Sequence, residues 1–452
     1  MGRNSVSEMS DADRRWRYPD ITPAAFAERP AEKHRLVVPY DITSSSPMEI
    51  VAAIGDLCEI VWIVELDNPS LGPMARLLPR LGHVIDTSGL SSDAVVDLLR
   101  DEPVDGVIAF TDSQLQVASA IGKSFDLAHN PLNVVEQLID KYIQRNALEV
   151  AGIKVPRFRR IPRTSEATQV RELVGDLTFP LVLKPLRGFS SRNVQVVNDV
   201  RALTDLFEMK TSGIKISADD YIVEEYLTGR VIPGMQAIGD YVSVELIVQD
   251  GHPTPVAITG KFPLAPPFRE SGNFMPHPLD ADEAHQVFDL SIDAAHALGV
   301  QCGALHAEIK LTLDGPRIIE VNGRVGGGGI DSIFKSTRGY SLTELATRVA
   351  LGERLELVAE EPARWSGPFT YQFFVQPSMS AHFLRSIAGT KELAGIQGID
   401  SVQVHESPGD EIHWEQGSQG YLAQVGGRVQ DRTALFSIPT TIHESLQITY
   451  DY

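Results

Sequence analysis

The chain has 452 residues with 40 basic and 60 acidic side chains, so its formal net charge is −20. This acidic excess argues against a nucleic acid partner, since phosphate binding needs a basic surface, and no apolar run approaches the roughly 18 residues of a membrane-spanning helix. Two cysteines cannot form a disulfide framework, and this low cysteine content fits the reducing cytoplasm. The length of the chain predicts about three domains.

The N-terminal part of the chain predicts a parallel α/β domain. Residues 1–33 are polar and aperiodic, and we interpret them as a flexible extension that contains no secretory signal. Within 34–130, apolar runs at 34–42, 60–66 and 104–110 alternate with segments of helical spacing. Strands that alternate with helices are typical of a parallel sheet.

The following part is richer in strands. One helix is predicted from residue 130 to Gly152, because glycine is favoured directly after a helix. The region from about residue 361 mixes short strands and turns, and it shows no obvious site. Between these two regions the pattern predicts strands at 179–197, 221–230 and 241–262, a further helix at 282–300 and a hairpin at 302–324.

The strongest chemical signal lies in the hairpin at 302–324. Glu320, Asn322 and Arg324 alternate with apolar residues and share one face of the second strand. Glu308 on the first strand lies beside Glu320 if the loop between the strands has an odd number of residues. Two adjacent carboxylates repel each other unless a cation lies between them, and Mg²⁺ prefers such oxygen ligands. Asn322 would supply a third oxygen, whereas the alternative is a solvated face with a Glu–Lys pair.

Two lysines and an acidic strand are candidates for nucleotide binding. Lys184 precedes a Gly/Ser loop at 187–193, whose backbone N–H groups can approach phosphate oxygens. Lys141 follows Asp140 in the predicted helix, and Glu224 begins an acidic pair between apolar residues that could form an adenine-binding hinge. Taken alone, each lysine is also compatible with a surface charge, and the acidic pair with an edge strand.

Six short motifs follow one another in a characteristic order. They are D-K at 140–141, A-G-I-x-V-P at 151–156, L-V-L-K-P at 181–185, V-E-E-Y-L-x-G at 223–229, E-I-K-L at 308–311 and I-E-V-N-G-R at 319–324. This order resembles the ATP-grasp superfamily of carboxylate–amine ligases. The resemblance extends from about residue 34 to the end of the chain.

The resemblance implies an ATP-grasp fold of the α/β and α+β classes, in which ATP lies between two α+β subdomains behind the N-terminal parallel α/β domain. It divides the chain into that domain, an ATP-grasp domain at 131–355 with a lid at about 155–228, and a C-terminal α+β subdomain at 356–452. ATP and Mg²⁺ are the implied cofactors, with Mn²⁺ as a substitute. The resemblance also implies a role for each candidate residue. The phosphates are contacted by Lys141, Lys184, Ser190 and Ser191, adenine by Glu224, Glu225 and the backbone near Leu227, and the ribose by Asp240 or Glu245. Mg²⁺ is held by Glu308, Glu320 and Asn322, and Arg324 stabilises the charge on the group that is transferred.

The implied reaction is attack of a substrate carboxylate on the γ-phosphate, followed by attack of an amine on the acyl phosphate. Residues 263–276 resemble the corresponding loop of bacterial L-amino-acid ligases, which make dipeptides or peptide-like natural products. The histidine that this group carries is replaced here by Asn273, and His277 or His306 could substitute for it. The residues implied in substrate binding are Glu270, Asn273, Arg324, Gly327 and Gly328.

Other classes fit less well. A biotin-carboxylase-like enzyme would carry a longer glycine cluster than 187–193, and a non-catalytic ATP-binding module would be expected to lack some of the metal ligands. A nicotinamide oxidoreductase would need a G-x-G-x-x-G motif after the first strand, where none occurs. A homodimer is compatible with the related ligases. No zinc site is expected, because the spacing of His285, His296, Cys302 and His306 fits no closed tetrahedral site.

Overall fold

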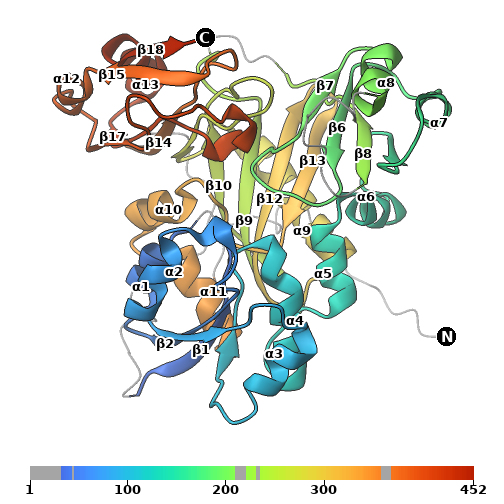
Figure 1. Ribbon diagram of the computed structural model, residues 1–452, viewed down its shortest axis with the longest axis vertical. Helices are drawn as coiled ribbons and strands as arrows, with labels where there is room; N and C mark the ends of the chain where they lie inside the picture. The colour runs from blue at the N-terminus through green and yellow to red at the C-terminus, as the bar shows by residue number, and fades with distance from the viewer. Residues whose placement is uncertain (1–31, 43–44, 209–219, 231–234, 358–367) are drawn as a thin grey trace, which may run out of the picture.

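The structure is a computed structural model, in which residues 32–42, 45–208, 220–230, 235–357 and 368–452 are described. The predicted N-terminal extension at 1–33 therefore lies outside the described residues, except for its last two. Within this part of the chain no helix is both long and apolar enough to cross a membrane. Figure 1 shows the N-terminal layer at the bottom of the molecule, with the lid at the upper right and the C-terminal region at the upper left.

The N-terminal part forms the predicted parallel α/β layer. Its strands have the order β3-β2-β1-β4, and all neighbours pair in parallel. Apolar side chains of β1 and β2 are buried on both faces, as parallel strands require, and Trp62 is fully buried. The elements are β1 His34–Pro39, α1 Pro47–Ile54, β2 Cys58–Val64, α2 Met74–Leu77, β3 His83–Asp86, α3 Ser92–Leu98, β4 Gly106–Val107 and α4 Leu115–Ser124.

The helix predicted to end at Gly152 is in fact two helices, α5 (Leu132–Ile139) and α6 (Lys141–Val150). The break lies at Asp140, whose backbone is extended and whose carboxylate accepts two hydrogen bonds from N–H groups in the first turn of α6, at 2.9 and 3.0 Å. Asp140 is thus the N-cap of α6. This cap fixes Lys141 as the first residue of α6.

A small antiparallel sheet and two helices form the lid. The strand order is β5-β8-β6-β7. Leu181, Leu183 and Val223 face the helices in its core, so the alternating residues Lys184 and Glu224 face away from them. Residues 209–219 of the predicted lid lie outside the described residues. The elements are β5 Phe158–Ile161, α7 Ala167–Leu173, β6 Leu181–Pro185, β7 Gln195–Val197, α8 Val200–Glu208 and β8 Tyr221–Glu225.

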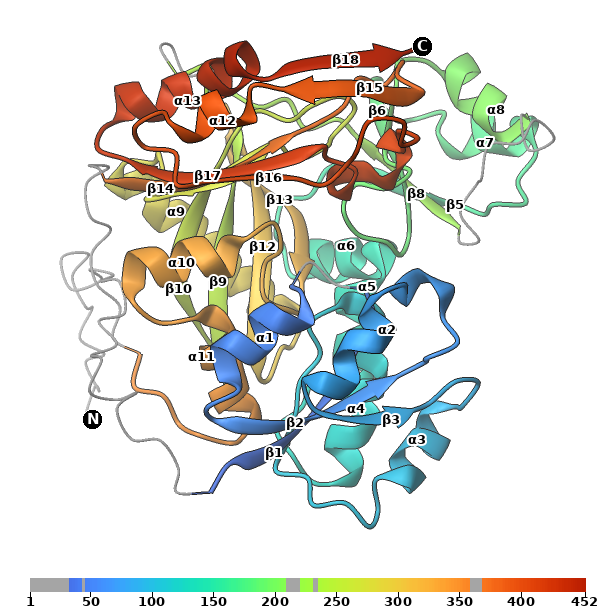
Figure 2. The ribbon, with the colours of Figure 1, turned by 60° about the vertical axis from the view of Figure 1, so that its left-hand side comes forward.

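An eight-stranded antiparallel sheet spans the rest of the molecule, in the order β13-β12-β9-β10-β11-β14-β17-β16. Its last three strands come from residues beyond 368, so the sheet continues from the expected ATP-grasp domain into the expected C-terminal subdomain at 356–452. Figure 2 shows these C-terminal strands above the N-terminal layer. The strands are β9 Tyr241–Gln249, β10 His252–Lys261, β11 Gly272–Met275, β12 Gly303–Thr312, β13 Gly315–Asn322, β14 Phe369–Val375, β16 Ser401–Val404 and β17 Ala423–Val429.

Helices cover this sheet and leave one polar face open. Helix α9 packs through Val287 and Phe288 on the apolar face of β9, β12 and β13, which leaves the opposite face for polar side chains. A separate two-stranded sheet of β15 and β18 lies at the C-terminal end. The remaining elements are α9 Ala281–Ala297, α10 Ile330–Arg338, α11 Leu342–Ala350, β15 Phe383–Ala388, α12 Thr390–Ala394, α13 Arg432–Ser445 and β18 Gln447–Asp451.

Candidate active site

A cavity of about 1100 Å³ lies where the N-terminal layer, the lid, the large sheet and the C-terminal strands meet. Two of the predicted site residues, Glu245 and Asn273, are buried and do not line it. The other predicted residues do: Lys141, Lys184, Ser190, Ser191, Glu224, Glu225, Leu227, Glu270, Glu308, Glu320, Asn322, Arg324, Gly327 and Gly328.

Glu308 and Glu320 pair directly across the hairpin, although not for the reason predicted. Strands β12 and β13 are joined by a two-residue turn, which without further irregularity would pair Glu308 with Ile319. A β-bulge at Ile319 shifts the register by one residue, so that Glu308 pairs with Glu320. Ile319, predicted to face away, therefore lines the cavity together with Glu320.

Positive charge already surrounds this pair of carboxylates. Lys141 Nζ lies 2.7 Å from Glu320 Oε1, and His306 Nε2 lies 3.5 Å from Glu308 Oε1. Burial is the largest single effect and would raise the pKa of Glu308, but the hydrogen bond and charge of His306 together with the charge of Lys261 outweigh it, and the pKa is lowered. Glu308 is thus ionised at neutral pH, as a ligand of a divalent cation must be.

The oxygen donors Glu308, Glu320 and Asn322 suit Mg²⁺ better than a metal whose ligands must all come from protein side chains. In the described part of the chain, no three or more His, Cys, Asp or Glu side chains are arranged to hold a metal ion. Mg²⁺ is commonly held by one or two carboxylates and completes its coordination with water and substrate phosphates. Two facing carboxylates and the nearby amide of Asn322, all at the cavity surface, fit that preference.

Arg324 is held at the cavity by a residue that the sequence analysis missed. Its Nε donates to Asp112 Oδ2 at 2.9 Å, and both side chains are largely buried. Burial is the largest single effect and lowers the pKa of Arg324, but the carboxylates of Asp112, Glu320 and Glu308 together outweigh it and raise the pKa. Asp112 follows the end of the parallel strand β4, the edge at which parallel sheets bind ligands, and that position was the available signal.

Lys184 and Glu224 belong to a buried charge cluster with Arg145, another residue that the sequence analysis missed. Glu224 Oε2 lies 2.6 Å from Lys184 Nζ, and Glu224 Oε1 accepts from Arg145 Nε at 2.6 Å. Burial raises the pKa of Glu224, yet the two cations outweigh it and the pKa is lowered. The Glu224 carboxylate therefore acts as a counter-ion, and its contact with adenine stays a prediction.

Replacing Glu224 by glutamine is expected to destabilise the protein by roughly 3–5 kcal/mol, because Arg145 and Lys184 would lose the carboxylate that compensates them in a buried site. The neighbouring Glu225→Gln variant is the matched control. Its side chain accepts from the Thr178 N–H at 2.8 Å, which glutamine can still do, and its ion pair with Arg157 is exposed. Urea unfolding should show a loss of under about 1 kcal/mol for this control. Equal losses in both variants would contradict the buried cluster.

Glu245 is placed away from the cavity surface, so the geometry does not support its predicted ribose contact. Both of its carboxylate oxygens lie 3.0 Å from His306 Nδ1, and Oε1 also accepts from Ser243 Oγ at 3.0 Å. It thereby orients the imidazole that reaches Glu308. The alternative candidate, Asp240, pairs at 2.6 Å with Lys310, whose side chain lines the cavity.

The Gly/Ser loop at 187–193 contacts Lys141, and both were predicted to bind the phosphates of ATP. Lys141 Nζ donates to the carbonyl of Gly188 at 3.1 Å. Ser190 and Ser191 both have φ of 56°, and Asn193 has φ of 58°, in the left-handed region that non-glycine residues rarely adopt. Such strained residues concentrate at functional sites.

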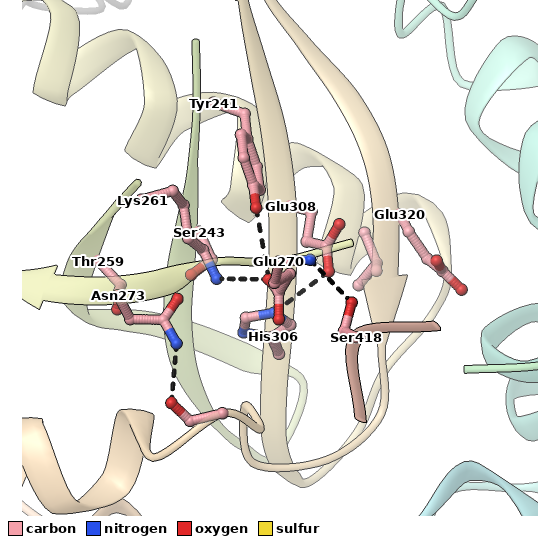
Figure 3. Close-up of polar contacts among 12 residues, drawn as sticks. Tyr241, Ser243, Thr259, Lys261, Glu270, Asn273, His306, Glu308, Glu320 and Ser418 are labelled. Carbon is pink, nitrogen blue, oxygen red and sulfur yellow. Dashed lines mark hydrogen bonds and ion pairs between the residues drawn. The ribbon is translucent and has the colours of Figure 1, made fainter. Parts of the chain in front are cut away.

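Glu270 lines the cavity and lies at the centre of a polar network (Figure 3). Its Oε1 accepts from Lys261 Nζ at 3.2 Å and from the Tyr241 hydroxyl at 3.5 Å. Lys261 is almost fully buried, and its ammonium lies over the Tyr241 ring. Both residues were missed, because Lys261 ends a strand that otherwise reads as apolar.

The glycine run after Arg324 is held by the asparagine that replaces the histidine of the related ligases. Asn273 Nδ2 donates to the carbonyl of Gly328 at 2.8 Å (Figure 3). Gly328 and Gly329 have φ of 61° and 73°, in the left-handed region that favours glycine. Of the two candidates to replace the missing histidine, His306 lines the cavity and His277 does not.

The C-terminal strands contribute directly to the cavity, although the sequence of this region shows no obvious site. Phe374 and Tyr421 stack with ring centroids 4.8 Å apart, and His405 contacts Tyr421 edge-on. Short strands without periodic charge give no local signal for this role. The C-terminal residues that line the cavity are Gln372, Phe374, Ser401, Gln403, His405, Ser418, Gln419, Tyr421 and Gln424.

A family model described as an ATP-grasp domain matches residues 177–332. A solved L-amino acid ligase from Bacillus licheniformis shares the fold, with a TM-score of 0.70 over 94% of this chain and 100% of that chain, at 19% identity. The chain thus contains a region that matches the ATP-grasp domain. The resemblance inferred from its motifs and the predicted fold class are thereby confirmed.

Two curated relatives of this chain carry ligase or synthase names. Alanine–anticapsin ligase of Bacillus subtilis (strain 168) is 26% identical over 345 residues, which are 72% of this chain and 71% of that protein. Dapdiamide A synthase of Enterobacter agglomerans is 22% identical over 344 residues, 73% of this chain and 75% of that protein.

Proposed function

We propose that this protein is an ATP- and Mg²⁺-dependent carboxylate–amine ligase that joins an amino acid to an amine or a second amino acid, releasing ADP and phosphate. The main support is the pairing of Glu308 with Glu320 across the hairpin. Lys141 Nζ lies 2.7 Å from Glu320 Oε1, and Arg324 lines the same cavity. The similarity to alanine–anticapsin ligase and dapdiamide A synthase supports a role in natural-product biosynthesis.

The nucleotide end of the cavity is the part formed with the lid. Lys141 and Lys184 are placed to bind phosphate oxygens as point charges, with the backbone of the Gly/Ser loop at 187–193 beside them. Glu225 and the backbone near Leu227 would contact the adenine. Glu308, Glu320 and Asn322 would hold Mg²⁺ (or Mn²⁺ in its place), which when bound neutralises charge on the phosphates.

The acyl end lies on the open face of the large sheet. A carboxylate oxygen of the first substrate attacks the γ-phosphorus and ADP leaves; the amine nitrogen then attacks the acyl carbon, loses a proton and displaces phosphate. Arg324, fixed by Asp112, stabilises the negative charge that develops in both steps. Glu270 binds an ammonium group, and Gly327 and Gly328 offer backbone N–H groups to a substrate carboxylate.

Two alternatives remain, a biotin-carboxylase-like enzyme and a non-catalytic ATP-binding module. A solved biotin carboxylase from Campylobacter jejuni shares the fold at a TM-score of 0.60 and 14% identity, which is a likeness of fold alone. The loop at 187–193 is shorter than the glycine cluster of that class. A non-catalytic module would have no need of the facing carboxylates, Lys141 and Arg324 together, and all of them line the cavity here.

The test is to incubate the purified protein with ATP and Mg²⁺ and measure ADP release across a matrix of paired amino acids and simple amines. We expect release to require one particular pair and to yield a product with their summed mass minus water. Single substrates and reactions without Mg²⁺ are the controls. Release of AMP, or ADP release that no pair stimulates, would contradict the proposed ligase.

We also propose that the enzyme acts in the cytoplasm on small molecules. The support is that Cys58 and Cys302, the two cysteines of the chain, are both free thiols, as a reducing compartment permits. The homodimer stays a prediction.

A further inference from the structure

One short segment of the C-terminal region contacts both ends of the cavity. This segment, Trp414–Gln419, lies between the Gly/Ser loop of the lid and the loop that carries Glu270. At its centre the backbone N–H of Ser418 donates to the carbonyl of Ser190 at 2.8 Å. The hydroxyl of the same residue accepts from the backbone N–H of Glu270 at 2.9 Å (Figure 3).

The lid side of this bridge has further contacts. Arg192 donates from Nε to the carbonyl of Gln416 and from its terminal nitrogen to Gln419 Oε1, both at 3.1 Å. Gly417 has φ of 70°, and a Cβ there would lie 2.0 Å from the carbonyl oxygen of Ser190. Only glycine permits this approach, so the segment is shaped to fit the loop.

The substrate side is equally specific. Gln376 Nε2 donates to the carbonyl of Glu270 at 2.6 Å and to the carbonyl of Ser418 at 3.1 Å. The backbone N–H and the backbone carbonyl of Glu270 are therefore both hydrogen-bonded, and its carboxylate accepts a hydrogen bond from Lys261. Ser418 is 8% exposed, so these bonds are shielded from water.

We propose that Ser418 is a positioning residue that couples closure of the Gly/Ser loop on the nucleotide to placement of Glu270 at the acyl centre. The inference rests on the proposed function and deepens it. A loop displaced from the phosphates withdraws the Ser190 carbonyl from Ser418, and Ser418 holds Glu270 in turn. The acyl phosphate then forms only when the amine-binding carboxylate is in place, which protects it from hydrolysis by water.

Hydrogen–deuterium exchange of the full-length protein with Mg²⁺ and the non-hydrolysable analogue AMP-PNP tests this coupling. In the wild type we expect protection to rise in 189–193, 414–419 and 268–271 together. In Ser418→Ala protection of 189–193 should persist, whereas that of 268–271 should fall by roughly three- to tenfold, the effect of one lost hydrogen bond. Ser418→Thr, which keeps the hydroxyl, should restore it, and the exposed Ser407→Ala is the matched control.

A second variant and an activity readout separate coupling from stability. Arg192→Met should weaken the response of 268–271 in the same direction. With the substrate pair found above, Ser418→Ala should release more ADP per amide formed, at unchanged KM for ATP, which a purely structural role would not produce. Equal protection of 268–271 in the wild type and Ser418→Ala would overturn the coupling alone. Absence of protection at 189–193 in the wild type would overturn the proposed nucleotide site as well.

Discussion

Glu320→Ala is expected to lower ADP formation by roughly 10³-fold while the fold stays intact. The side chain supplies one of the two facing carboxylates, and its Oε1 also anchors Lys141 at 2.7 Å. Without it the site loses half of its anionic ligand set and the fixed position of a phosphate-binding lysine. Initial rates of ADP release at saturating substrates, together with a thermal melt, measure both parts of the prediction.

The control for this variant is Asp314→Ala, which removes the same charge from the exposed turn of the same hairpin and should leave turnover unchanged. Titration with Mg²⁺ then separates a metal ligand from a lysine anchor. Half-saturation by Mg²⁺ should move to higher concentration in Glu320→Ala. Retained turnover, or a Mg²⁺ dependence identical to that of the wild type, would rule out the metal assignment.

Arg324→Ala should lower kcat by roughly 10²–10³-fold and change the affinity for ATP by less than about threefold. The guanidinium is largely buried and held by Asp112 at 2.9 Å, so it is oriented before the reaction begins. A preorganised charge acts mainly on the transition state, where negative charge develops. Steady-state kinetics and equilibrium titration with AMP-PNP supply the two quantities.

Asp112→Asn is the companion to this variant, since it keeps the charge of Arg324 but weakens the group that orients it. We expect about a tenfold loss in kcat, intermediate between the wild type and Arg324→Ala. If Arg324→Ala lost ATP affinity and turnover equally, the residue would have a role in ground-state binding instead.

Local patterns were sufficient to predict the hairpin and the residues that share its polar face but not the reason for its register. Alternation placed Glu320, Asn322 and Arg324 on one face, which the cavity confirms. The facing of Glu308 and Glu320 was expected from a loop of odd length, whereas the turn has two residues and the bulge at Ile319 makes the shift. A bulge depends on how both strands pack, so a simple two-residue period cannot reveal it.

Contacts between residues far apart in the chain could not be predicted from local sequence patterns. Arg145 compensates Glu224 from 79 positions away, and Arg324 is oriented by Asp112 from 212 positions away. The C-terminal strands were recognisable as strands, but β17 inserts between β14 and β16 to extend the large sheet. Such non-local pairing, and with it the contacts of Ser418, follows from tertiary packing rather than from any local pattern.

The central claim is that the substrate carboxylate is activated as an acyl phosphate. The most direct measurement uses the active substrate pair with the carboxylate oxygens of the acid labelled with ¹⁸O, and mass analysis of the released phosphate and nucleotide. We expect that one labelled oxygen passes into inorganic phosphate and that the nucleotide product is unlabelled ADP. Unlabelled phosphate, or label recovered in AMP, would contradict it.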